Sequence, residues 1–124
     1  MKTLESRLVL DLNHKPGNPR NSEGSFIRAD DGTILFAYSQ YYGTNGDDHQ
    51  PSNIALVRSK DEGETWSDCQ IIEQDKNNGK GFCYPAMFFT NDGCILIAYC
   101  RGGTEDGFCL FRTGIRKIRL QDIE

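Results

Sequence analysis

The strongest constraint on the fold of this chain is an internal repeat with a spacing of 61 residues. The segment 31–38 reads DGTILFAY, and the segment 92–99 reads DGCILIAY. In both, an Asp-Gly pair of the kind that favours β-hairpin turns precedes a run of β-forming residues. The alternative is a chance similarity, because two hairpins that are not repeat copies would also share an Asp-Gly turn and a run of β-forming residues. A repeat of this length, with about four strands per unit, is typical of propeller blades, which bury their faces against neighbouring blades.

The remaining apolar segments also read as short strands. They show no sustained period of 3.6 residues, so the sequence predicts an all-β fold. The expected strands span 8–12, 25–28, 34–42, 53–59, 70–73, 86–89, 95–101 and 115–120. We therefore expect a single unit over 1–124, with one blade at about 20–75 and a second at about 82–120. The second blade is one strand short, and the segment 8–12 is predicted to fill its edge, in its own chain or in a neighbour.

Charge and cysteine content exclude several classes of protein. The chain has 14 Lys and Arg against 18 Asp and Glu, and the basic residues are scattered, which argues against nucleic acid as a partner. The apolar run at 8–10 is too short for a signal sequence or a membrane span, so we expect a cytoplasmic protein without membrane contact. The five cysteines include no CxxC pair, so neither a metal nor a cofactor is predicted. Cys83 and Cys100 should lie nearly opposite each other on paired strands, where a disulfide is geometrically possible; in a reducing compartment we expect free, half-buried thiols.

One motif defines a turn. Residues 59–66, SKDEGETW, fit the pattern S-x-D-x-G-x-T-W at every defined position. We expect the Asp61 carboxylate to accept hydrogen bonds from turn amides, Gly63 to adopt a positive φ and Trp66 to pack on the sheet. Its structural residues are Ser59, Asp61, Gly63, Thr65 and Trp66. The pattern resembles the Asp-box, or BNR repeat, of sialidase (neuraminidase) propellers. This motif also occurs on other propellers, so it indicates a fold and does not identify a reaction.

The sequence around the first repeat unit is similar to the first blade of sialidases. The resemblance covers 18–27, NPRNSEGSFI, and the following hairpin. It implies that Arg20 binds the carboxylate of a sialic acid, a role that suits a guanidinium because it can donate two parallel hydrogen bonds to a carboxylate. The alternative is that Arg20 forms a surface ion pair. In the loop 43–51 it implies that Asp48, with Asp47 as the alternative, is the general acid/base, its pKa raised by the neighbouring like charge. A solvated polar turn is the competing interpretation, and His49 beside it is a candidate substrate contact.

The second repeat unit resembles the last blade of sialidases. In FCYPAM, residues 82–87, Tyr84 matches the nucleophile that opens the innermost strand, and 113–120 resembles the final strand. A neutral phenol suits this role because the substrate carboxylate would repel an Asp or Glu nucleophile. The alternative for Tyr84 is packing at the propeller axis. Glu23 occupies the equivalent repeat position and is a further candidate to face the substrate.

The resemblance joins the first and last blades of a six-bladed fold and lacks the middle ones. The other two arginines and the glutamate that activates the tyrosine have no match here. The sequence thus leaves two functions open: a sialidase-type glycosidase that takes sialic acid or a related acidic sugar, and a non-catalytic carbohydrate-binding or assembly propeller. Because two blades cannot close a ring, we expect a homotrimer that completes six blades; the alternatives are a truncated gene product and a sequence from which the remaining blades are absent.

Overall fold

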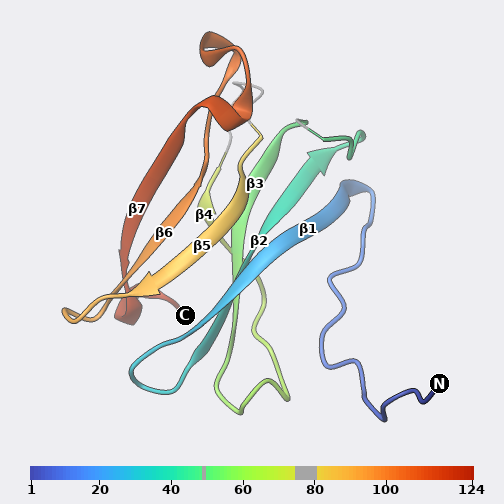
Figure 1. Cartoon of the computed structure of the whole chain (residues 1–124), viewed down its shortest axis with the longest axis vertical. Coiled ribbons are helices and arrows are strands. Elements are labelled where there is room, and N and C mark those ends of the chain that lie inside the picture. The colour runs from blue at the N-terminus through green and yellow to red at the C-terminus, as the bar shows by residue number, and fades with distance from the viewer. Residues whose placement is uncertain (49, 75–80) are drawn as a thin grey trace.

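The computed structural model describes residues 1–48, 50–74 and 81–124, and its regular structure is all-β apart from three single-turn 3₁₀ segments. Seven strands form two antiparallel sheets (Figure 1). The first sheet has the order β1(Gly17–Arg28), β2(Ile34–Gly43), β3(Ser52–Ser59) and β4(Gln70–Glu73). The second has the order β5(Cys83–Phe89), β6(Cys94–Cys100) and β7(Thr113–Arg119).

Both predicted Asp-Gly hairpins are present. Gly32 and Gly93 have φ values of 89° and 80°, the left-handed conformation that glycine adopts without a Cβ clash. In each hairpin the strand that follows the turn is the second strand of its sheet. The second sheet has three strands in the described chain, one fewer than the first, as the sequence predicts.

The first strand of each sheet starts earlier than the sequence predicts. β1 starts at Gly17 instead of Ser25, and β5 starts at Cys83 instead of Ala86. Both strands pass through a register shift, and at each shift one residue that is not glycine has a positive φ: Glu23 at 41° and Tyr84 at 56°. These two residues are repeat equivalents. The β-bulge is therefore a repeated feature, and it hides the strand from a search for regular alternation.

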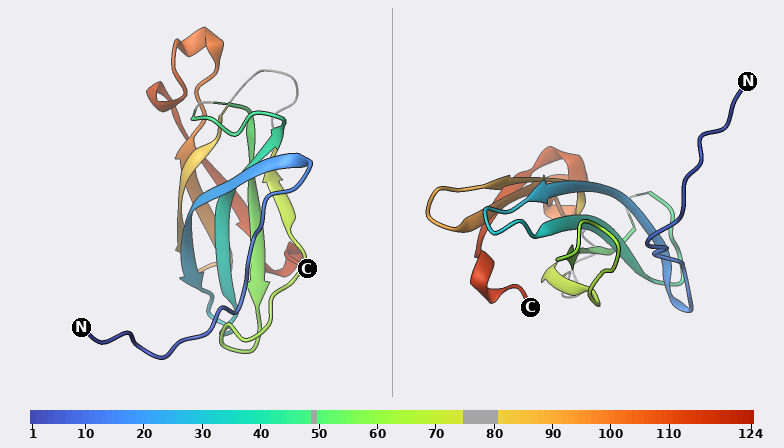
Figure 2. Two further views of the ribbon diagram at one scale, coloured as in Figure 1. Left: turned by 90° about the vertical axis from the view of Figure 1, so that its right-hand side faces the viewer. Right: turned by 90° about the horizontal axis from the view of Figure 1, so that it is seen from below.

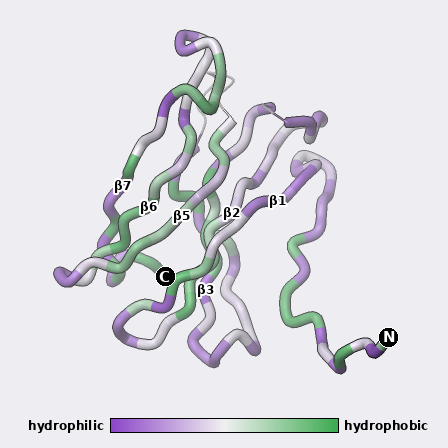
Figure 3. Tube along the Cα trace, in the orientation of Figure 1, coloured by the Kyte–Doolittle hydropathy of each residue, from purple (hydrophilic) through white to green (hydrophobic). Residues whose placement is uncertain are grey.

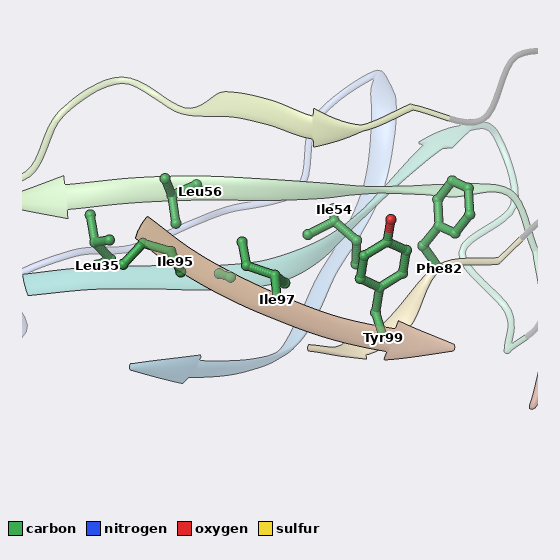
Figure 4. Packing of buried hydrophobic residues seen from close by; sticks show 8 residues of the cluster. Leu35, Ile54, Leu56, Phe82, Ile95, Ile97 and Tyr99 are labelled. Carbon is green, nitrogen blue, oxygen red and sulfur yellow. The ribbon is translucent and has the colours of Figure 1, made fainter. Parts of the chain in front are cut away.

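The main core lies between the two sheets. Leu35, Ile54 and Leu56 come from the first sheet and are at most 2% exposed. They pack against Ile95 and Ile97 of the second sheet, both 0% exposed (Figure 4). We call the side of the first sheet that carries Leu35 its front face, and the side of the second sheet that carries Ile97 its back face. Figure 2 shows the two sheets packed face to face through this contact.

The back face of the first sheet carries a smaller apolar cluster of Tyr38, Ala55 and Val57. Leu10 and Leu12 pack against it from the N-terminal segment, which is hydrophobic over part of its length (Figure 3). The segment 8–12 forms no strand and makes no ladder within the described chain, so it does not pair with the second sheet of its own chain. Its apolar side chains are held by the first sheet instead.

The turn between β3 and β4 has the predicted hydrogen bonds. Asp61 accepts from the Thr65 backbone amide at 2.8 Å and from its hydroxyl at 2.6 Å. Ser59 accepts from the Gly63 amide at 2.8 Å, and Gly63 has a φ of 86°. The Trp66 indole donates to the Gly63 carbonyl at 3.0 Å, and its ring packs on the back-face cluster. The Thr65 bonds, together with that from Ser59, hold the pKa of Asp61 at about 2.

An ionic cluster joins the outer strands of the two sheets. Glu73, at the end of β4, accepts hydrogen bonds from the Tyr99 hydroxyl and from Arg116 Nη2, the latter at 2.8 Å. The Glu73 side chain is 12% exposed and Tyr99 is 3% exposed. Burial by itself would raise the pKa of Glu73, but these hydrogen bonds outweigh it and hold the pKa below its ordinary value.

Candidate functional site

The predicted site residues lie at the end of the sheets opposite the Ser59–Trp66 turn. Arg20 lies near the start of β1, Asp48 in the connection from β2 to β3, and Tyr84 at the start of β5. Because β1 and β5 are the first strands of their sheets and contact each other, their starting residues come to one side of the molecule.

Arg20 is held by polar partners on several sides. Its Nη1 donates to Asp48 Oδ1 at 2.7 Å and to the Gly46 carbonyl at 3.1 Å, and its Nη2 donates to Glu23 Oε1 at 3.1 Å. Gly46 is required here because a Cβ would lie 2.9 Å from the Arg20 Cβ. The hydrogen bond to Asp48 raises the pKa of Arg20, which keeps the guanidinium charged.

Sequence reasoning missed two neighbours that fix the orientation of Arg20. The Arg20 Cζ lies 4.8 Å from the centre of the Tyr41 ring, a cation–π contact, and Nε donates to Ser22 Oγ at 2.9 Å. Tyr41 is 4% exposed, and burial raises its pKa, so the ring stays a neutral platform. The alternation of β2 places Tyr41 on the same face as Leu35, a position that the sequence pattern alone could have identified.

Asp48 and Glu23 are both brought to Arg20, but in a different electrostatic setting from the one predicted. The expectation for Asp48 was like-charge repulsion from Asp47. In the structure its near neighbour is the Arg20 guanidinium, 2.7 Å away. The Asp48 side chain is 74% exposed, so this ion pair is accessible to a ligand that competes for the guanidinium. The Asp47 amide donates to the Asn45 side chain at 2.9 Å, a contact of the turn itself.

Tyr84 is 58% exposed and lies on the side of the molecule that carries the carboxylates. The neighbours of Tyr84, Cys83 first and then Glu23 and Asp48, raise its pKa, and the two carboxylates disfavour a phenolate. In the isolated chain the Tyr84 side chain is open to solvent, and the alternative of packing at a propeller axis stays a prediction. No hydrogen bond from Tyr84 to a base is present among the described residues.

Two buried serines anchor the strand that carries Tyr84. The hydroxyls of Ser39 and Ser52 donate to the Phe82 carbonyl at 3.0 Å and 2.8 Å, and both serines are 0% exposed. Since Ser39 and Ser52 belong to the first sheet and Phe82 precedes the second, these bonds fix the start of β5 against β2 and β3. They set the position of Tyr84 relative to Arg20, and an inward-facing serine at position 39 of an apolar strand is the sequence signal for them.

The cysteines near Tyr84 form a group. Cys83 and Cys100 are register partners, as predicted, and all five cysteines are free thiols in the structure. Burial, together with Cys109 and Cys100, raises the pKa of Cys83 strongly. The thiol beside the candidate nucleophile is therefore neutral and inert under ordinary conditions.

Other candidate features lie elsewhere or are absent from the described residues. His49 lies outside them. No group of three His, Cys, Asp or Glu side chains that could hold a metal ion occurs in the ranges described, and no helix in those ranges is both long enough and apolar enough to cross a membrane. A cavity of about 490 Å³ lies at the opposite end, where Asp31, Arg58 and Arg119 line it beside the two Asp-Gly turns. It shares no residue with the Arg20 cluster, which lies on an open surface.

The fold is similar to two solved sialidase-type structures. One is the intramolecular trans-sialidase from Ruminococcus gnavus in complex with oseltamivir carboxylate: the TM-score is 0.61 at 14% identity, over 76% of this chain and 24% of that one. The other is the leech intramolecular trans-sialidase complexed with 2,7-anhydro-Neu5Ac: the TM-score is 0.60 at 17% identity, over 84% of this chain and 19% of that one. No protein-family model matches the sequence, and no curated protein matches it significantly.

These similarities establish the fold. The two sheets correspond to blades of a sialidase-type β-propeller, and the chain spans a quarter or less of the length of either neighbour.

Proposed function

We propose that this chain is a sialidase-type glycoside hydrolase that acts on terminal sialic acids. The observation that carries the proposal is the convergence of Arg20, Asp48 and Tyr84, from three separate elements, on one side of a sialidase-type fold. The assignment of the Ser59–Trp66 turn as an Asp-box is part of the same proposal, and its hydrogen bonds support it.

In this proposal Arg20 binds the substrate carboxylate. The guanidinium is already held against Tyr41, and its present partner Asp48 is exposed, so an incoming carboxylate exchanges for Asp48. Once displaced from Arg20, Asp48 takes up a proton from solvent and donates it to the leaving oxygen of the glycosidic bond. Binding and acid catalysis are thereby linked through one ion pair.

Tyr84 then attacks the anomeric carbon through its phenol oxygen. Glu23, its repeat equivalent at the matching bulge, is the proposed acceptor of the phenolic proton. Water afterwards cleaves the bond between Tyr84 and the sugar, with Asp48 acting as base. The positive φ of both Tyr84 and Glu23 supports a functional role, because strained backbone collects at such sites.

The decisive experiment measures release of a fluorogenic aglycone from a sialoside. We expect turnover by the parent chain, and losses of about 100-fold or more in kcat for Tyr84→Phe and in kcat/KM for Arg20→Ala. Arg28→Ala is the matched control: Arg28 lies on the same strand, at its far end, and pairs with Glu62. Absence of turnover by the parent, or equal turnover by all variants, would refute the hydrolase proposal.

A second function is favoured by the state of Tyr84. Its pKa is raised and no hydrogen bond to a base is present in the described residues, which suits a non-catalytic module that binds acidic sugars through Arg20. Titration with free sialic acid, followed by NMR, separates the two. Binding that depends on Arg20, without turnover, supports the binding module over the enzyme.

A further inference from the structure

The two sheets of this chain pack through different faces, and the repeat relates these faces to one another. Leu35 lies on the front face of the first sheet, and its repeat equivalent Leu96 lies on the opposite, front face of the second. Ile97 lies on the back face of the second sheet, and its equivalent Phe36 lies on the back face of the first. The contact inside the chain is thus front to back, and one face of each kind is left without a facing sheet.

Exposed aromatic side chains mark both of these remaining faces. Phe26, on the back face of the first sheet, is 65% exposed, whereas its equivalent Met87 packs on the core. Phe88, on the front face of the second sheet, is also 65% exposed, whereas its equivalent Ile27 packs on the core. The back face of the first sheet is therefore the repeat copy of the back face of the second, which the first sheet covers. The front face of the second sheet is the repeat copy of the front face of the first, which the second sheet covers. Apolar surface of this kind marks an interface.

We propose that three copies of this chain assemble head to tail into one closed ring. The front face of the second sheet of each copy covers the back face of the first sheet of the next. The occupant is a second copy because the same two kinds of face already pack together inside the chain. Such contacts are heterologous and close under threefold symmetry, and three pairs of blades complete the six of the sialidase-type propeller.

The N-terminal segment fits the same ring. In the internal contact Ile72, on the fourth strand of the first sheet, packs at the edge of the core. Leu10 and Leu12 hold the corresponding place on the back face of the first sheet. β7 is the edge strand of a sheet that has three strands among the described residues. In the ring, the segment 8–12 of one copy lies beside β7 of the neighbouring copy and supplies that strand, which removes an open edge.

Ring closure also changes the surroundings of the Arg20 cluster. β1 and β5 contact each other in the chain, so in the ring the first strands of all six sheets lie around the axis. Three copies of the cluster then face a common centre, which converts an open surface into a cup. The proposed assembly depends only on the two sheet faces, so its test is independent of the test for glycoside hydrolysis.

Light scattering coupled to size-exclusion chromatography tests the ring. We expect about 42 kDa, three times the 14.0 kDa chain, at micromolar concentration. Phe26→Arg and Phe88→Arg each remove one face and should give monomers of 14.0 kDa. Ile115→Arg, on the same front face and 70% exposed, serves as a second variant if Phe88→Arg fails to fold by circular dichroism. Phe111→Arg is the control, because Phe111 is 74% exposed but lies in a 3₁₀ segment outside both faces; it should stay trimeric.

Mixing the two face variants tests the head-to-tail arrangement. Phe26→Arg keeps an intact front face and Phe88→Arg keeps an intact back face, so an equal mixture should form a heterodimer of about 28 kDa. An isologous dimer would give no such rescue, because both of its copies use the same face. A parent chain that stays at 14.0 kDa, an oligomer that neither substitution affects, or a mixture that stays monomeric would each overturn the proposal.

Discussion

Replacing Glu73 with Gln should destabilise the chain, because the Glu73 carboxylate joins the outer strands of the two sheets. It accepts hydrogen bonds from Tyr99 and Arg116, and Arg116 Nε also donates to the Tyr99 hydroxyl at 3.3 Å. A hydrogen bond to a charged group is worth about 1.5–3 kcal/mol. Gln keeps the shape and one acceptor, and the Arg116 side chain is 47% exposed, which weakens its part by solvent screening. We expect a loss of about 1–2 kcal/mol in the free energy of unfolding.

Urea denaturation at a fixed protein concentration measures this loss. With a urea dependence of about 2 kcal/mol per M, the midpoint should fall by about 0.5–1 M. Glu62→Gln is the matched control: Glu62 pairs with Arg28 on the surface, with side chains 71% and 54% exposed, and the change should cost less than about 0.5 kcal/mol. Equal losses in the two variants would refute the argument that the Glu73 cluster holds the sheets together.

The pH dependence checks that the effect is ionic. The pKa of Glu73 is below its ordinary value of 4.5 in the folded chain, so its contribution is complete above that value and is lost as the pH falls through the folded pKa. The difference between the parent and Glu73→Gln should therefore shrink below about pH 4. A difference that stayed constant down to pH 2 would assign the loss to packing instead of charge.

Three further changes test the local geometry by the same unfolding assay. Gly24→Ala should cost about 1–3 kcal/mol, because its Cβ would lie 2.7 Å from the Ala37 carbonyl oxygen and overlap the Phe36 ring; an unchanged midpoint would contradict the close approach of β1 and β2. Asp61→Ala should lower the urea midpoint through its lost bonds to Thr65, and Asp68→Ala, at an exposed position after the same turn, should leave the midpoint near that of the parent. Tyr84→Gly should be neutral or stabilising because it relieves a positive φ; a loss as large as that of Gly24→Ala would show that the Tyr84 backbone is unstrained.

The sequence predicted the fold because its strongest signals are local. The Asp-Gly turns and the repeat placed β2, β3, β4 and β6 within a residue or two of their observed bounds. The early part of β1 was not predictable, because Pro19 and Glu23 argue against a strand and both lie at register shifts in the pairing with β2. The segment 8–12 looked like a strand by propensity, but strand formation also needs a hydrogen-bonding partner, which its own chain does not supply.

The candidate site divides in the same way. Arg20, Asp48 and Glu23 were predictable as a set, because the resemblance and the repeat assign them together, and the structure joins them by ion pairs. The supports were missed: Tyr41, Ser39 and Ser52 read as ordinary strand residues, and their contacts cross between elements that are distant in sequence. A motif can identify a side chain that acts by itself. It cannot identify the residues that position that side chain, because their contacts depend on packing between distant elements.

The paired bulges at Glu23 and Tyr84 carry a consequence for how new sites arise on this fold. The same backbone conformation, at the same place in two repeat units, presents an acid in one and a phenol in the other. The backbone conformation of the bulge is thus independent of the side chain at that position. A duplicated blade inherits this bulge. A single substitution at its position then changes the chemistry at this end of the sheets and leaves the strand pairing unchanged.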